Sequence, residues 1–225
     1  MIHNVADRRT RFSDPFRTQA RVQPATSSAT SSAVLASVLT LVDTAQLVQR
    51  ILSEAFPSTS FDISVAKNEH GSQLAISWTD GPRDLQVARL VMPLQAVRLA
   101  DGGRRERVEH FMLTPAGRHT VQLAADRIVL SRQFSDAAVA RALTRLASRY
   151  ADHLKPEVRA GMTVAAYRAN KLHAFEISGV HRTVDYRSGS NLQTDVDELL
   201  AATTTTQGFP RSLTAARLFV RRDAH

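Results

Sequence analysis

The chain has 225 residues, 43% of them hydrophobic, which is enough for one or two folded domains with a substantial core. It contains no cysteine, which excludes disulfides, thiolate zinc sites and cysteine nucleophiles, and no apolar run approaches the roughly 18 residues of a membrane span. The formal net charge is +8, which favours polyanionic partners at low salt, and no secretory signal is recognisable, so we expect a cytoplasmic protein with no membrane partner.

The first 38 residues read as a basic tail with no periodic apolar pattern. They carry five arginines and the low-complexity run Ala-Thr-Ser-Ser-Ala-Thr-Ser-Ser at 25–32. Such a composition buries too little apolar surface to offset the loss of chain entropy on folding. The sequence therefore predicts a disordered segment over 1–38, either a solvated tail or a basic arm that contacts nucleic acid.

A helix is predicted from Asp43, a suitable N-cap, to Pro57, which cannot continue it. The apolar residues between them recur at helical spacing: Leu47, Val48, Ile51, Leu52 and Ala55. Apolar and polar residues then alternate over 61–65 and again over 73–78, with glycine in the turn between. This pattern predicts two antiparallel strands with one buried face, with Trp78 in the core.

The run Thr79-Asp80-Gly81-Pro82 returns the chain from the second strand to a helix. Pro82 suits the first helical turn, and Thr79 or Asp80 can cap it. Because helix N-termini bind anions, this corner, together with Trp78, is a candidate anion or phosphate contact. The alternative is a purely structural corner beside a buried Trp78.

Two further strands, 108–113 and 121–130, are predicted before the most regular helix of the chain. Ser135 is the expected N-cap of that helix, and its apolar face comprises Val139, Ala142, Leu143, Leu146 and Tyr150. Arg141, Arg145 and Arg149 follow one another at a spacing of four, which puts them on one side of the helix. Because no acidic residue accompanies them, the row is a candidate nucleic-acid contact, and a solvated helix face is the alternative.

The last seventy residues have weaker periodicity. Strands are predicted over 163–167, 172–177 and 181–186, a short helix over 192–200, and a final amphipathic stretch over 213–220.

No pattern in the sequence indicates catalysis, a metal or a cofactor. None of the eight histidines lies in a nucleophile motif; His110 and His119 flank the predicted hairpin and could meet across it, but a surface hairpin with unrelated histidines is the better interpretation. The run Gly102-Gly103-Arg104-Arg105 lacks the ending of a phosphate-binding loop and predicts a turn with solvated arginines. We therefore expect no enzymatic activity.

Several segments together resemble the large polyvalent protein-associated domain number 29. The most specific are Phe56-Pro57 and Ile76-Ser77-Trp78-Thr79-Asp80-Gly81-Pro82, and the helix at 44–50 and the strand at 61–65 agree with them. The strand at 125–129, Arg132 and the helix to Tyr150 resemble the end of that domain. The resemblance covers about 40–152, and residues 94–120 depart from its pattern.

The resemblance implies a module of bacterial phages, plasmids and integrative elements, some of whose proteins enter a recipient cell with the DNA and counter its defences. It brings no catalytic residue. We expect a non-enzymatic protein that contacts nucleic acid non-specifically or binds a host defence protein. The alternatives are a protein-binding module with incidental charge and a nuclease-like enzyme.

The expected fold class is α+β, a small antiparallel sheet packed by amphipathic helices. We expect this domain over 39–153, between the tail at 1–38 and a less regular α+β extension or subdomain at 154–225.

Overall fold

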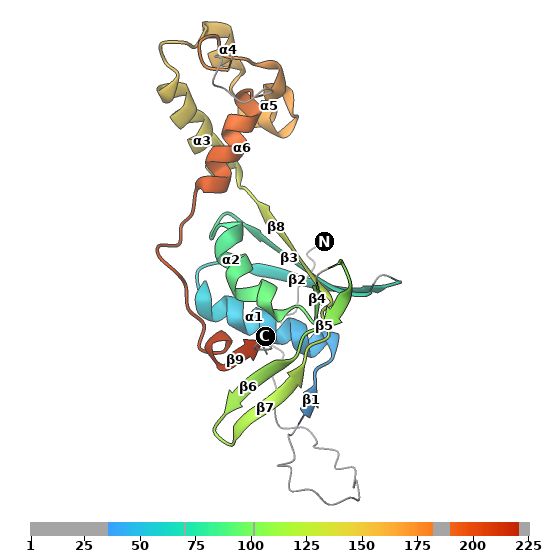
Figure 1. Cartoon of the computed structure of the whole chain (residues 1–225). Coiled ribbons are helices and arrows are strands. Elements are labelled where there is room, and N and C mark those ends of the chain that lie inside the picture. The colour runs from blue at the N-terminus through green and yellow to red at the C-terminus, as the bar shows by residue number, and fades with distance from the viewer. Residues whose placement is uncertain (1–35, 70, 101, 182–189, 221–225) are drawn as a thin grey trace, which may run out of the picture.

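Two small sheets, a two-stranded hairpin and the helices packed beside them form one part of the molecule, and a bundle of short helices forms the other (Figure 1). The computed structural model describes residues 36–69, 71–100, 102–181 and 190–220. We call the first part, residues 36–133 and 212–220, the sheet body, and the second, residues 134–202, the helical lobe. Within the described residues the expected α+β class is confirmed.

Helix α1 (Leu41–Ala55) begins three residues earlier than predicted. Its N-cap is Thr40 rather than Asp43. The Thr40 hydroxyl accepts from the Asp43 amide at 3.1 Å, and the Asp43 carboxylate accepts from the Thr40 amide at 3.0 Å. These reciprocal bonds form a capping box, which requires the acidic residue three positions inside the helix rather than at its start.

The two predicted antiparallel strands are confirmed as β2 (Phe61–Asn68) and β3 (Gly71–Thr79). Strand β8 (Arg127–Gln133) joins them in parallel to β3, which gives the order β2-β3-β8. Trp78 lies in the core as predicted, with 3% of its surface exposed. Helix α2 (Asp84–Val91) and the 3-10 turn η2 (Met92–Leu94) follow β3.

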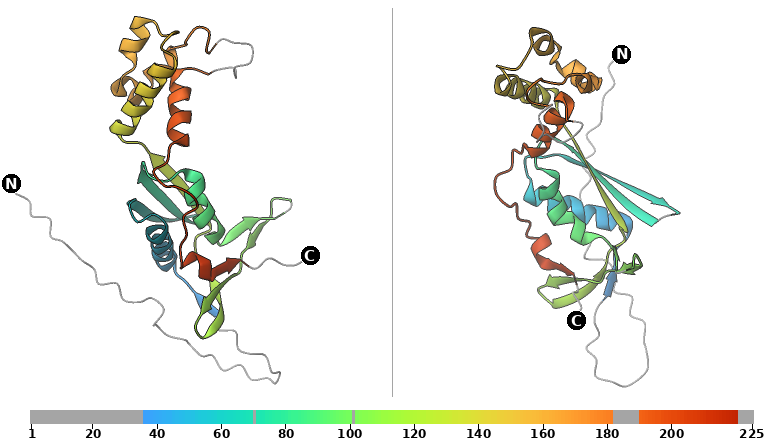
Figure 2. Two further views of the ribbon diagram at one scale, coloured as in Figure 1. Left: turned by 90° about the vertical axis from the view of Figure 1, so that its left-hand side faces the viewer. Right: turned by 45° about the horizontal axis from the view of Figure 1, so that its top comes forward.

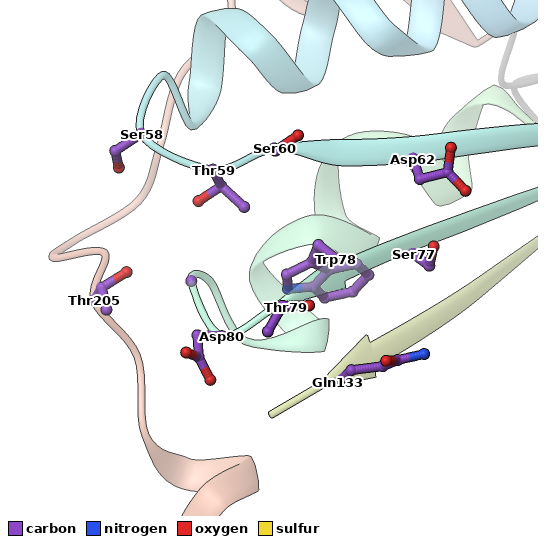
Figure 3. A pocket seen from close by; sticks show the side chains of 11 residues that line it. Ser58, Thr59, Ser60, Asp62, Ser77, Trp78, Thr79, Asp80, Gln133 and Thr205 are labelled. Carbon is purple, nitrogen blue, oxygen red and sulfur yellow. The ribbon is translucent and has the colours of Figure 1, made fainter. Parts of the chain in front are cut away.

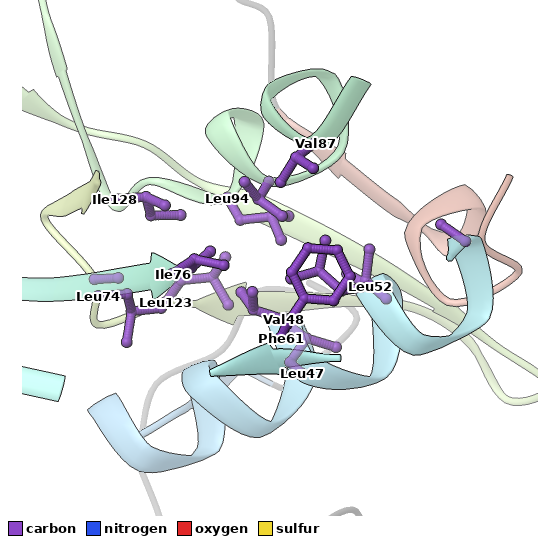
Figure 4. Close-up of a cluster of buried hydrophobic side chains, with 14 of the residues drawn as sticks. Leu47, Val48, Leu52, Phe61, Leu74, Ile76, Val87, Leu94, Leu123 and Ile128 are labelled. Carbon is purple, nitrogen blue, oxygen red and sulfur yellow. The ribbon is translucent and has the colours of Figure 1, made fainter. Parts of the chain in front are cut away.

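The core of the sheet body lies between α1, α2 and this sheet (Figure 4). Figure 4 shows Leu47, Val48 and Leu52 of α1 directed toward Ile76 of β3, with Val87 of α2 on the far side. Helix α1 thus buries the apolar face that its sequence predicts, and hydrophobic burial against the sheet stabilises it.

A second sheet has the strand order β1-β7-β6-β9. Its strands are β1 (Ala36–Val38), β6 (His110–Thr114), β7 (Gly117–Gln122) and β9 (Leu218–Val220), and a separate hairpin pairs β4 (Val97–Leu99) with β5 (Arg105–Arg107). The single strand predicted over 121–130 is wrong, because the chain leaves β7 after Gln122 to bury Leu123 and Ala125, and re-enters the other sheet at Arg127.

The helical lobe contains α3 (Asp136–Arg149), α4 (Pro156–Gly161), α5 (Val164–Arg168), the 3-10 turn η3 (Lys171–Ala174) and α6 (Leu192–Ala202). Ser135 is the N-cap of α3 as predicted, since its hydroxyl accepts from the Ala138 amide at 3.2 Å.

The strands predicted over 163–167 and 172–177 are wrong. Thr163 instead caps α5, and Asn170 takes a left-handed conformation that starts η3. Most of the third strand predicted there, 181–186, lies outside the described residues, and His181 itself is in a turn.

The buried side chains separate into two clusters at residue 134, not at residue 153 as the expected division had it. One cluster ends at Ile128 with partly buried Leu130 beside it, whereas the other begins with Phe134 and Ala138 and includes the whole apolar face of α3. After α6 the chain returns along 203–211, and the described part finishes in β9, beside β6 (Figure 2). The helical lobe is therefore inserted between two strands of the sheet body.

Deleting residues 1–35 is expected to leave the thermal unfolding transition unchanged, because their composition provides little apolar surface to bury. Residues 36–38, which the sequence analysis assigns to the tail, form a strand that pairs with β7, and the Leu39 amide donates to the Gln122 carbonyl at 3.0 Å. The predicted tail over 1–38 is therefore three residues too long. Residues 1–35 lie outside the described part. Deleting 1–38 should therefore lower the midpoint measured by circular dichroism, whereas a loss of the transition on deleting 1–35 would contradict the prediction.

The returning C-terminal segment is held to α1 by one carboxylate. Glu54 accepts from the Ser212 hydroxyl at 2.6 Å, the Thr214 amide at 2.9 Å and the Thr214 hydroxyl at 2.6 Å. The 3-10 turn η4 (Ala215–Arg217) follows and leads into β9. Partial burial raises the pKa of Glu54, but these hydrogen bonds and nearby Arg50 outweigh it, so the pKa is below its ordinary value of 4.5.

Acidification is expected to release the C-terminal segment before the rest of the sheet body. Because the folded-state pKa of Glu54 is lowered, its contribution is complete above pH 4.5 and is lost as the pH falls through the lowered pKa. Protection against hydrogen exchange at residues 212–220, relative to the intrinsic rate at each pH, should fall below that pH in the wild type, and Glu54→Gln should show low protection there already at neutral pH. Exchange in the variant that matches the wild type at neutral pH would contradict this role.

Candidate anion-binding junction

The corner after β3 is a strained turn that holds the sheet body against the start of the helical lobe. Asp80 and Gly81 both have positive φ, 58° and 61°. A Cβ atom at position 81 would come within 2.8 Å of the Thr59 hydroxyl, so glycine is required there on two grounds. The Asp80 amide donates to the Gln133 carbonyl at 2.8 Å, which ties the corner to β8.

The corner does not cap α2 in the way the sequence predicts. The N-cap is Arg83, so Pro82 precedes the helix and neither Thr79 nor Asp80 reaches its first turn. The Asp80 carboxylate instead accepts from the Ser135 amide at 3.0 Å, at the start of α3. The indole of Trp78 donates to the Pro82 carbonyl at 3.0 Å and fixes the corner from inside.

Arg132, on β8, ties the corner to the segment that returns from the helical lobe, and this role has no signal in the local sequence pattern. Its Nε donates to the Asp80 carbonyl at 2.8 Å, and its Nη2 donates to the carbonyls of Gly81 at 3.1 Å and Thr203 at 2.9 Å. Its guanidinium also stacks 4.8 Å from the centre of the Phe134 ring. Burial lowers the pKa of Arg132, an effect that Asp84 and Asp80 partly offset, but arginine stays protonated in proteins.

Replacing Arg132 by glutamine should lower the free energy of unfolding by roughly 1–3 kcal/mol, because three backbone carbonyls lose a charged donor. Denaturant unfolding measures this loss, and hydrogen exchange should rise at 80–81 and 203–205. Arg127→Gln on the same strand is the matched control, since Arg127 is exposed and its side chain forms no hydrogen bond or ion pair with any of the described residues. Equal effects of the two substitutions would contradict the joining role.

Beside Arg132 lies a cavity of about 290 Å³, which we call the junction cavity. Its lining combines the corner, the row of arginines on α3, the end of α6 and the returning segment: Asp80, Gly81, Arg132, Phe134, Ala138, Arg141, Ala142, Arg145, Leu199, Leu200, Thr203 and Thr205. The fold thus brings together two candidate sites that are some sixty residues apart in the sequence. Arg149, one turn further along α3, does not line it.

A second hollow, of about 480 Å³, opens on the other side of the same corner (Figure 3). Hydroxyl groups dominate it, and Figure 3 shows Ser58, Thr59 and Ser60 on one side and Gln133 on the other. Its acidic groups are Asp62 and Asp80, and no basic residue lines it. The chemistry of this hollow favours neutral polar groups over anions.

The row formed by Arg141, Arg145 and Arg149 lies exposed along α3, beside its buried apolar face. No hydrogen bond or ion pair joins these arginines to any of the described residues. Asp136, the acidic residue in the first turn of α3, is engaged by Arg168 at 2.9 Å. All three residues of the row are exposed, and none of their guanidinium groups forms an ion pair with a carboxylate within the described part of the chain.

The two hairpin histidines do not form a pair. His110 lies opposite Val121 and His119 opposite Met112. His110 is fully buried, and its Nε2 lies 2.9 Å from the Pro93 carbonyl. Burial lowers the pKa of His110, and the Pro93 carbonyl partly offsets this effect.

The helical lobe contains a buried polar network that the sequence did not reveal. The Asp195 carboxylate accepts from the Tyr150 hydroxyl at 2.9 Å and lies 2.8 Å from Nε2 of His181, while Nδ1 of His181 accepts from the Ile177 amide at 2.9 Å. Because both ring nitrogens are engaged, this histidine ties the loop before residue 182 to α6 rather than presenting a free base. Among the described residues no group of three or more histidine or acidic side chains is placed to hold a metal ion.

Comparison with known proteins gives one match. Residues 39–135 match the family model of large polyvalent protein associated domain 29, which confirms the resemblance and ends it at the start of α3. No curated protein and no solved structure matches the chain. In the described residues no helix has the length and apolar character to cross a membrane.

Proposed function

We propose that this chain is a non-enzymatic accessory protein of a bacterial mobile element that binds nucleic acid with little sequence preference, in the service of counter-defence. The match of residues 39–135 relates it to proteins of phages and mobile elements. The observation that carries the nucleic-acid assignment is the exposed row of Arg141, Arg145 and Arg149, whose side chains form no hydrogen bond or ion pair with any of the described residues.

The geometry of α3 supports contact with a phosphate backbone. Successive members of the row are about 6 Å apart along the helix axis, since each residue advances about 1.5 Å. The row begins at the junction cavity, which Arg141 and Arg145 line, and continues to Arg149 one turn further along α3. Arginine forms bidentate hydrogen bonds with phosphate oxygens, and such contacts position a nucleic acid without reading its sequence.

A salt series tests this proposal. Fluorescence anisotropy of a labelled random duplex should show binding at about 50 mM salt, weakening steeply toward about 200 mM as counterions are released. Two duplexes of unrelated sequence should bind with similar affinity. Absence of binding at about 50 mM salt would favour the alternative of a protein-binding module, with a host defence protein as its partner. Metal-dependent cleavage of the duplex would instead indicate a nuclease.

A further inference from the structure

The junction cavity has more positive than negative charge in its lining. Three guanidinium groups line it, those of Arg132, Arg141 and Arg145, against the single carboxylate of Asp80, which already accepts from the Ser135 amide. The acceptors for Arg132 are uncharged backbone carbonyls, and its Nη1 is buried with no hydrogen-bond partner among the described residues. The cavity therefore favours an anionic ligand.

The rest of the lining is largely apolar. Phe134, Ala138, Ala142, Leu199 and Leu200 form this wall, and Thr203 and Thr205 supply hydroxyls from the returning segment. A volume of about 290 Å³ is at the lower end for ligand pockets, so it suits one small group and excludes a duplex. The lining fits a phosphate attached to a planar, weakly polar ring, because aromatic and apolar side chains pack on the faces of nucleobases.

We infer that the junction cavity binds a single phosphorylated nucleotide, with its phosphate on Arg141 and Arg145 beside Arg132 and its base against the apolar wall. The nucleotide is either free or the phosphorylated end of a strand. This inference rests on the proposed function, because it assigns a terminal phosphate group to two of the same arginines. The inference goes beyond the proposed function, because phosphate contacts with the arginine row on α3 alone would bind the end and the interior of a strand equally well.

Binding of short single strands by the full chain tests the inference. Strands of one sequence carry a 5′-phosphate, a 3′-phosphate or hydroxyls at both ends, with an internal fluorescent label. One terminal phosphate should tighten binding about tenfold, the effect expected of a charged hydrogen-bonding group. Arg141→Gln with Arg145→Gln should abolish this preference. Arg149→Gln is the matched control and should retain it, while weakening all strands alike.

A variant that fills the cavity but keeps every arginine tests whether the cavity itself is needed, independently of its positive charge. Thr205 is exposed at the cavity lining, so Thr205→Trp should obstruct the cavity without disturbing the buried clusters. The preference for a terminal phosphate should then disappear while the salt dependence of duplex binding stays unchanged. Competition with adenosine monophosphate decides the source: displacement of the phosphorylated strand identifies a free nucleotide as a ligand, and failure to displace it identifies the strand end.

Equal affinity for phosphorylated and hydroxyl strands would overturn the inference, and so would a preference that persists in both Thr205→Trp and the Arg141→Gln, Arg145→Gln variant. Duplex binding with its full salt dependence would then still support the proposed function. In the opposite case, no duplex binding but a retained preference for phosphorylated ends, the proposed duplex contact fails and the cavity assignment stands.

Discussion

Replacing Trp78 by alanine is expected to lower the free energy of unfolding by about 3–5 kcal/mol, as large truncations in well-packed cores do. The indole is 3% exposed, and its ring centre lies 5.6 Å from that of Phe61, which in turn lies 5.8 Å from Phe56. The substitution also leaves the Pro82 carbonyl without its donor. Alanine therefore opens a cavity and removes a buried hydrogen bond at one place.

Denaturant unfolding followed by far-UV circular dichroism measures this loss, since Trp78 is the single tryptophan and its fluorescence disappears with it. Trp78→Phe is the matched control; it retains most of the aromatic volume and should cost clearly less than alanine. Hydrogen exchange should rise first in β2, β3 and β8, which share the core with Trp78. An unchanged unfolding midpoint in the alanine variant would show that Trp78 does not hold the core together.

The parts of the fold that the sequence predicts well are those set by local periodicity. Helix α1, strands β2 and β3 and the apolar face of α3 each follow from the spacing of apolar residues within one element. The corner at Gly81 is also visible, because glycine before proline marks a change of direction. Cap positions were less reliable: an acidic residue near a helix start serves equally as the N-cap or as the third residue of a capping box, as Asp43 does.

The parts that could not be predicted depend on contacts distant in the sequence. Short helices such as α5 have too few residues for a helical period to show, and the short apolar run at 164–167 is equally typical of a buried strand. Strand β9 exists because Glu54 holds the segment that leads into it and β6 offers a free edge, neither of which the last residues reveal. The division of the core at residue 134 likewise depends on tertiary packing, because the apolar face of α3 packs in the cluster of the helical lobe and not in that of the sheet body.

For the candidate site, the sequence identified the residues but not their arrangement. The row on α3 and the corner at 79–82 were each singled out, and the structure places Arg141 and Arg145 in one cavity with Asp80 and Gly81. Arg132 completes that arrangement through carbonyls at 80, 81 and 203, a set of partners that no spacing rule suggests. Arg132 lies directly opposite Trp78 in the pairing of β3 with β8, and this position beside the corner can be inferred only once the strand register is known.

Removing the row should change the response of nucleic-acid binding to salt more than any other surface substitution. Each phosphate contact on duplex DNA contributes about 0.9 to the slope of log K against log salt, so replacing Arg141, Arg145 and Arg149 by alanine should reduce its magnitude by roughly 3 units. The loss should be similar for unrelated sequences, because phosphate contacts carry no sequence information. Thermal unfolding should be unaffected, since all three side chains are exposed.

A variant with the same change of charge elsewhere provides the control. Arg107, Arg118 and Arg127 are exposed on the sheet body, and their replacement by alanine also removes three positive charges. If net charge alone drove binding, the two triple variants would behave alike. If α3 is the contact surface, the control should keep most of the wild-type slope.

The most direct test of the proposed nucleic-acid contact is therefore the salt slope of duplex binding, measured by fluorescence anisotropy for the wild type and both triple variants under identical conditions. The account predicts a slope about 3 units smaller in magnitude for the α3 variant and a nearly unchanged slope for the control. A wild type that binds while the α3 variant keeps its slope would contradict the account and place the contact surface elsewhere.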